Sequence, residues 1–144
     1  MIRFENAVSI DRRTEDVFAF LADFRNVPRW NYAIVETRQV SEGPVGVGTR
    51  YRQHRSVPRP SEEELEITTF DPPARLGFRG TLGPFSAEVD YRLEPDDDGT
   101  RLTNEMRLQP RGPLALVGKL AAGRVGDAVA SNLLALKQIL EGER

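Results

Sequence analysis

The chain has 144 residues, with 20 basic and 22 acidic side chains and no cysteine. This length is typical of one domain, so we expect a single domain over residues 1–144. The charges are mixed along the chain without a basic run, which argues against nucleic acid as a partner. The lack of cysteine excludes disulfides, zinc–thiolate sites and iron–sulfur clusters, and the single histidine, His54, excludes a histidine-rich metal site.

The N-terminal sequence lacks the long apolar core of a signal peptide. No apolar run approaches the ~20 residues that a membrane-spanning helix needs. We therefore expect a cytoplasmic protein without a membrane span.

The start of the chain predicts a strand followed by two short helices. Residues 2–10 alternate between apolar and polar side chains, which is typical of a half-buried strand. A helix is expected from Thr14, because acidic residues follow it and apolar side chains recur at helical spacing as far as Phe24. Pro28 suits the first turn of a second short helix, which we expect to end at Trp30.

From 33 to 109 the pattern is almost entirely that of strands. Apolar and polar residues alternate in the segments IVETRQV, TRYRQHRSV, EEELEITTF, RLGFRGTL, PFSAEVDYRL and RLTNEMRL. Turn sequences separate them, including Asp71–Pro72–Pro73 and the Asp-Gly step of EPDDDGT. Because hairpin follows hairpin, these segments predict one antiparallel sheet with one face in water.

Arg111–Gly112–Pro113 interrupts the strand pattern, and residues 114–141 are expected to form one long helix. Its apolar side chains share one face, and charged or polar side chains lie opposite them. The order is therefore a strand, two short helices, six strands and a long helix. It predicts an α+β domain in which a seven-stranded sheet carries the long helix on one face.

Five stretches in this order resemble the START-like helix-grip (SRPBCC) superfamily, and specifically its polyketide cyclase/dehydrase branch. They are DRRTEDVFAFLADFRNVPRW, VGVGTRYR, FDPPARLGF, EPDDDGTRLTNEM and LLALKQILE. The resemblance covers essentially the whole chain. It implies a curved sheet wrapped around the C-terminal helix, with an elongated apolar cavity between them. It also implies that the two short helices form a V. Trp30 would then be a packing residue that fills the junction between this V, the second strand and the long helix.

The sequence singles out no catalytic residue. His54 has the strand parity of Arg50 and Arg52, which points it to solvent. The carboxylates form no convincing pair, and SEEELE at 61–66 is interpreted as a solvated strand face or edge. No serine lies in a G-x-S-x-G elbow.

Several polar side chains fall on faces that are otherwise apolar. Asn132 lies at the centre of the long helix's apolar stripe, and Asn104 shares a strand face with Leu102 and Met106. An unpaired buried amide costs about 1–3 kcal/mol, so these groups must bond one another, water or a ligand. A few polar groups in an apolar cleft suit a small-molecule site, and a cross-bonded or water-filled core is an equal alternative. The predicted cavity lining is Tyr51, Gln53, Arg55, Ile67, Phe78, Val89, Tyr91, Asn104, Met106, Val125 and Asn132.

We expect a hydrophobic small molecule, whether aromatic, polyketide-like or lipid-like, to bind between the sheet and the C-terminal helix of a monomer or homodimer. The first alternative is an enzyme resembling polyketide cyclases and aromatases, which would use Tyr, Arg and Asn side chains in the same cavity without a cofactor or metal. The lack of an inward histidine or a carboxylate pair favours binding. A protein-partner module is the second alternative, because Leu116, Leu120 and Leu134 fall on the polar side of the long helix.

Overall fold

The computed structural model describes residues 2–111 and 118–142. The chain begins with a strand and three short helical segments, which are β1 (Ile2–Ile10), α1 (Thr14–Ala22), the 3-10 helix η1 (Phe24–Asn26) and α2 (Val27–Trp30). The remaining elements are β2 (Ile34–Gln39), β3 (Arg50–Arg55), β4 (Ser61–Asp71), β5 (Arg75–Leu82), β6 (Phe85–Asp96), β7 (Gly99–Pro110) and α3 (Gly118–Gly142). Every predicted element is present, and residues 114–117 of the predicted long helix lie outside the described residues.

The break after α1 follows from the chemistry of its side chains. The Asp23 carboxylate accepts a hydrogen bond of 3.1 Å from the backbone N–H of Arg25, which caps the start of η1. Pro28 lies in the first turn of α2, where a missing N–H costs no helical hydrogen bond. The chain therefore changes direction twice before Trp30, and the two short helices form the predicted V.

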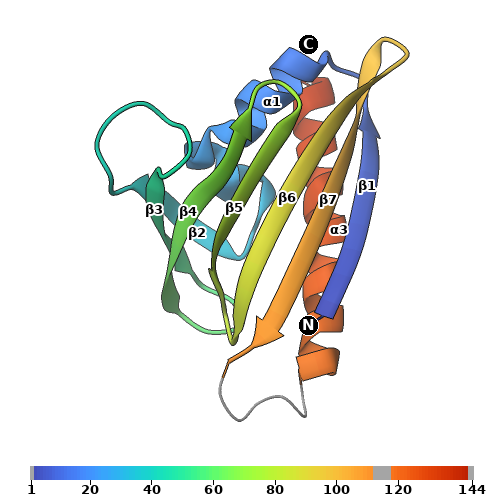
Figure 1. The fold of residues 1–144 in the computed structure, drawn as a ribbon. Coiled ribbons are helices and arrows are strands. Elements are labelled where there is room, and N and C mark those ends of the chain that lie inside the picture. Colours follow the sequence, from blue (N-terminus) through green and yellow to red (C-terminus); the bar gives the residue numbers. More distant parts are fainter. Residues whose placement is uncertain (1, 112–117, 143–144) are drawn as a thin grey trace.

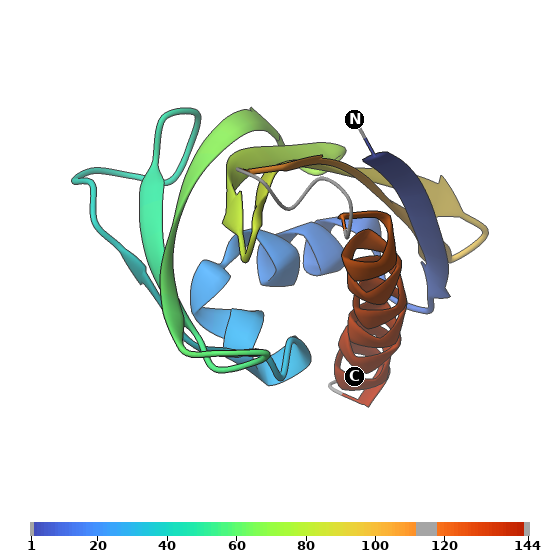
Figure 2. The same ribbon diagram turned by 90° about the horizontal axis from the view of Figure 1, so that it is seen from below.

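The seven strands form one antiparallel sheet in the order β1-β7-β6-β5-β4-β3-β2. The first strand pairs with the last, so β1 and β7 lie side by side next to α3 (Figure 1). Register shifts in β2 and β4 are β-bulges, which add bend to the sheet's normal twist. Figure 2 shows the result, a sheet curved around α3 and the α1–α2 segment. This is the α+β helix-grip fold that the sequence predicts.

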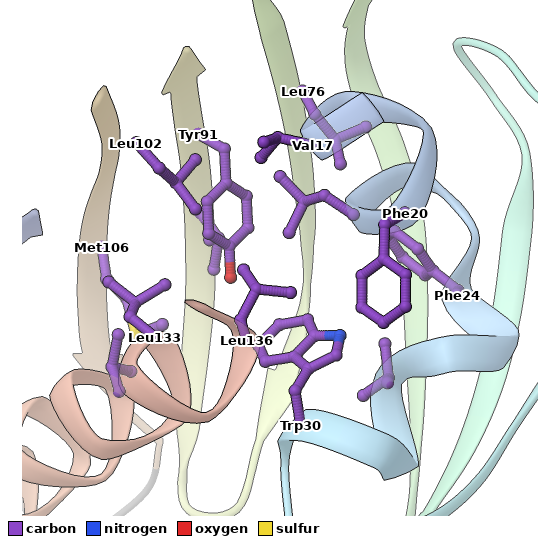
Figure 3. Close-up of a cluster of buried hydrophobic side chains, with 14 of the residues drawn as sticks. Val17, Phe20, Phe24, Trp30, Leu76, Tyr91, Leu102, Met106, Leu133 and Leu136 are labelled. Carbon is purple, nitrogen blue, oxygen red and sulfur yellow. The ribbon is translucent and has the colours of Figure 1, made fainter. Parts of the chain in front are cut away.

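The core lies between the concave face of the sheet and the helices (Figure 3). Alternate residues of β6 and β7 are buried there, as their period of two requires. On α3 the buried side chains include Leu133, Leu136 and Leu140, which recur at helical spacing. Within residues 2–111 and 118–142, no helix is both long and apolar enough to cross a membrane.

Candidate ligand cavity

A cavity of about 140 Å³ lies between the inner face of the sheet, α2 and α3. Most of its wall is apolar, with side chains from the short helices, strands β3 to β7 and the middle of α3. The exposed Tyr32 also contributes to the wall, so the cavity reaches the surface beside this residue. The full lining is Leu21, Phe24, Val27, Trp30, Asn31, Tyr32, Ala33, Gln53, Arg55, Leu65, Phe78, Gly80, Thr81, Leu82, Ala87, Val89, Tyr91, Met106, Val125, Ala128, Val129 and Asn132.

Most of the residues predicted from the sequence come together at this cavity. Those in its wall are Gln53, Arg55, Phe78, Val89, Tyr91, Met106, Val125 and Asn132. Tyr51, Ile67 and Asn104 do not line it, although all three are buried on the inner face as their strand parity requires. The Tyr51 ring stacks on Phe24 at 4.4 Å between centroids, while neighbouring side chains cover Ile67 and Asn104 completely. Parity predicts the face of a strand but not the depth of a side chain within the core.

Trp30 is buried as predicted, with 8% of its surface exposed. It packs where α2 meets β2 and α3, and it also lines the cavity (Figure 3). Its indole Nε1 has no hydrogen-bond partner among the described residues and no access to water. The residue is therefore a packing element that a bound molecule would also contact.

A buried carboxylate lies behind the polar end of the cavity, where the sequence analysis placed only solvated charges. Glu63 of β4 is 2% exposed, so the interpretation of SEEELE as a solvated face is wrong at this position. Its Oε1 accepts a hydrogen bond of 2.7 Å from Gln53 Nε2. Its Oε2 accepts bonds of 2.9 Å from Arg55 Nε and 2.7 Å from the backbone N–H of Gly83. Three donors around two oxygens are the surroundings that an ionised carboxylate requires when buried.

The sheet register explains why these groups meet. Gln53 and Glu63 are direct partners across β3 and β4, and Arg55 follows two residues later on the same face of β3. Gly83 belongs to the turn between β5 and β6. The Glu63 carboxylate therefore links this turn to strands β3 and β4. The available signal was the period of two in β4, because Glu63 shares the parity of Leu65 and Ile67. The acidic run around it concealed that signal.

Neutral polar groups also line the cavity. Asn132 faces the sheet, as its helical phase predicts, and its side-chain amide forms no hydrogen bond with another described residue. The Tyr91 hydroxyl points into the space between sheet and α3 (Figure 3). Burial raises the pKa of Tyr91 to about 12, partly opposed by the amide of Asn104, so the phenol stays protonated at neutral pH.

Asn104 is the least satisfied of the predicted residues. It lies opposite Tyr91 in the β6–β7 register and is fully buried. Neither its Nδ2 nor its Oδ1 reaches hydrogen-bonding geometry with a described residue, so its effect on Tyr91 is that of a nearby dipole. His54 is exposed, as predicted. No group of three His, Asp or Glu side chains within the described ranges could hold a metal ion.

Comparison with known proteins gives a consistent picture. The family model described as "Polyketide cyclase / dehydrase and lipid transport" matches residues 1–141. An uncharacterized protein of Mycobacterium tuberculosis is 32% identical over an alignment of 117 residues that covers 76% of this chain and 67% of that protein.

Solved structures of distant sequence share the fold. A Thermus thermophilus protein superposes with a TM-score of 0.80 at 20% identity, over 99% of both chains. A START superfamily protein from Mycobacterium smegmatis gives a TM-score of 0.79 at 16% identity, over 96% of this chain and 98% of that one. The di-domain ARO/CYC protein BexL of the BE-7585A biosynthetic pathway gives 0.75 at 21% identity, over 96% of this chain and 46% of that one.

Proposed function

Because the chain belongs to the polyketide cyclase / dehydrase and lipid transport family, we propose that it binds a hydrophobic small molecule between the sheet and α3. The observation that carries this proposal is the apolar cavity of about 140 Å³ between the two layers. Natural cores leave few voids larger than a water molecule, so a space of this size is unlike ordinary packing.

The volume of the cavity limits what can enter without rearrangement. An engineered apolar cavity of about 150 Å³ in another protein binds benzene, so this one has room for roughly one aromatic ring. A longer polyketide-like or lipid-like molecule would extend toward Tyr32, where the cavity reaches the surface. Asn132 and the Tyr91 hydroxyl would then orient the enclosed part, since buried polar groups gain most from a partner.

A cavity-filling substitution tests this proposal. Ala128 of α3 lines the cavity, and Ala128→Leu places three further carbons in it. We expect single-ring compounds such as ethylbenzene to shift the backbone amide resonances of wild-type residues around the cavity, and these shifts to disappear in the variant. Ala130→Leu is the matched control, because Ala130 belongs to the same helix but not to the cavity wall. Equal shifts in wild type and Ala128→Leu would contradict the proposal.

Catalysis of the polyketide cyclase or aromatase type is the second candidate, and Tyr91 is the observation that favours it. A phenol with a pKa of about 12 remains a hydrogen-bond donor at neutral pH and could polarise a carbonyl oxygen in the cavity. The resemblance in fold to an ARO/CYC protein supports testing this reaction class. A catalytic role predicts that a poly-β-ketone cyclises faster with the protein, and that Tyr91→Phe loses the acceleration while still binding ethylbenzene.

A further inference from the structure

The inference concerns the polar end of the cavity and rests on the proposed function. Arg55 lines the cavity, and its side chain is 11% exposed. Only its Nε is bonded, to Glu63 at 2.9 Å. Its two terminal nitrogens are not fully buried, and neither forms a hydrogen bond with another described residue. Arg55 therefore offers unused N–H donors at this end.

Gln53 presents the opposite polarity at the same place. Its Nε2 donates to the Glu63 carboxylate at 2.7 Å, and a carboxylate can only accept, so this orientation of the amide is required. The amide oxygen then points elsewhere, and Gln53 also lines the cavity. A guest molecule at this end meets donors from Arg55 and an acceptor from Gln53.

The charge of Arg55 is already balanced. Glu63 lies against the guanidinium with its side chain only 3% exposed, and its two oxygens hold three hydrogen bonds. The buried pair carries no net charge. A guest carboxylate would add a second negative charge close to Glu63 and to the Gln53 oxygen, after losing its own hydration. A neutral carbonyl oxygen would use the Arg55 donors without that cost.

We propose that Arg55, neutralised by Glu63, selects ligands that carry a neutral acceptor such as a ketone or aldehyde oxygen and disfavours carboxylates. The ligand class that follows is an aromatic or otherwise apolar body whose carbonyl lies against the Arg55 guanidinium. Glu63 acts here as a positioning residue, since it sets the charge and orientation of Arg55 and does not itself line the cavity.

Three single-ring compounds of similar size separate the possibilities. Ethylbenzene is apolar, acetophenone carries a neutral acceptor and benzoate carries a charge. Titrations followed by backbone amide chemical shifts give a dissociation constant for each and locate its site. For the wild-type protein we expect acetophenone to bind at least about tenfold more tightly than ethylbenzene, the scale of one hydrogen bond to a charged donor, with benzoate weakest.

Removing the carboxylate should reverse the discrimination against benzoate. In Glu63→Gln the Gln53 amide can turn over to keep a hydrogen bond, while Arg55 loses its counter-charge. We expect benzoate to bind about tenfold more tightly than to wild type, because a buried guanidinium gains most from an anionic partner. Acetophenone should change by less than about threefold. Glu64→Gln, which removes the same charge from the exposed partner of Arg52, is the control and should leave all ratios unchanged.

Each outcome bears on the inference. If wild type binds benzoate more tightly than acetophenone, or binds ethylbenzene as well as acetophenone, the inference is overturned and ligand binding itself stands. If Glu63→Gln folds and its affinity for benzoate does not change, the role of Glu63 is overturned. If that variant does not fold, the wild-type ranking alone decides the selectivity. If none of the three compounds binds, the proposed function fails together with this inference.

Discussion

Two buried polar clusters on the inner face of the same sheet contrast in how their groups are paired. In one cluster, Glu63 accepts hydrogen bonds from Gln53, Arg55 and the backbone of Gly83. In the other, Tyr91 and Asn104 face each other across β6 and β7, and both amide atoms of Asn104 lack a partner among the described residues. The first cluster contains charges and the second contains none.

The contrast follows from what burial costs. A bare carboxylate loses far more hydration energy than an amide, so only a fully bonded Glu63 is compatible with a stable fold. An unpaired amide costs about 1–3 kcal/mol, which a domain of this size can tolerate. The charged cluster is therefore expected to contribute to stability, and the neutral cluster is expected to be where replacing a polar side chain by an apolar one increases stability.

The largest expected effect is on the charged cluster. Glu63→Ala leaves a buried guanidinium, an amide and a backbone N–H without their acceptor, and should lower the free energy of unfolding by about 3–5 kcal/mol. Urea unfolding measures the change. Glu64→Ala, on the exposed face of the same strand, should stay within about 0.5 kcal/mol of wild type. If Glu63→Ala lowers the free energy of unfolding by less than about 1 kcal/mol, the charged cluster does not contribute more to stability than the neutral one.

The pH dependence of stability probes the neutral cluster. Burial raises the pKa of Tyr91 from 10.0 to about 12, so the folded state holds the phenolic proton more tightly than the unfolded state. Its contribution is complete below pH 10 and is lost as the pH rises toward 12, at up to about 1.4 kcal/mol per pH unit. The free energies of unfolding of wild type and Tyr91→Phe are measured in urea from pH 8 to about 12. The difference between the two curves separates the contribution of Tyr91 from those of other titrating groups. Parallel curves would place Tyr91 in contact with water.

Asn104→Leu should raise the free energy of unfolding, whereas Glu63→Ala should lower it. Leucine has the same number and branching of side-chain heavy atoms as asparagine and leaves no unpaired polar atom, so the free energy of unfolding should rise by about 1 kcal/mol. Asn6→Leu is the matched control, because Asn6 lies opposite Asn104 in the β1–β7 register but is only half-buried, and we expect little change. A clear loss of stability in Asn104→Leu would show that the amide does have a partner, such as a buried water.

The smallest expected effect is on binding alone. Asn132→Leu removes the amide that α3 presents to the cavity, keeps the fold and should weaken binding of a ring compound with a second polar group, such as 4-hydroxyacetophenone, by about 1 kcal/mol, the scale of one hydrogen bond. Calorimetric titration or amide chemical shifts measure it. Ser131→Leu changes the exposed neighbour and should bind as wild type does. Unchanged affinity in Asn132→Leu would confine ligand recognition to the Arg55 end.

Much of the site could be predicted from strand and helix periodicity. Alternation in β3 placed Gln53 and Arg55 inward and His54 outward, and helical phase placed Asn132 toward the sheet. The same rule applied to β4 would have placed Glu63 inward, but the acidic residues on both sides of it made a solvated face the simpler interpretation. Alternation places Tyr51 and Asn104 on the correct face of the sheet, but it does not predict that other side chains separate them from the cavity. Whether an inward side chain reaches the cavity depends on which side chains of other elements cover it.

The sequence by itself determined the order of the elements, the antiparallel sheet and the inward face of each strand, because periods of two and 3.6 and the turn residues are local properties of the chain. Only the tertiary structure decided that Glu63 meets Arg55 and the N–H of Gly83, that Tyr91 faces an unpaired Asn104, and that a cavity remains between sheet and α3. These features depend on strand register, on where the β5–β6 turn lies, and on how α3 packs across the curved sheet. They arise from distances between residues far apart in the chain, which local periodicity does not encode.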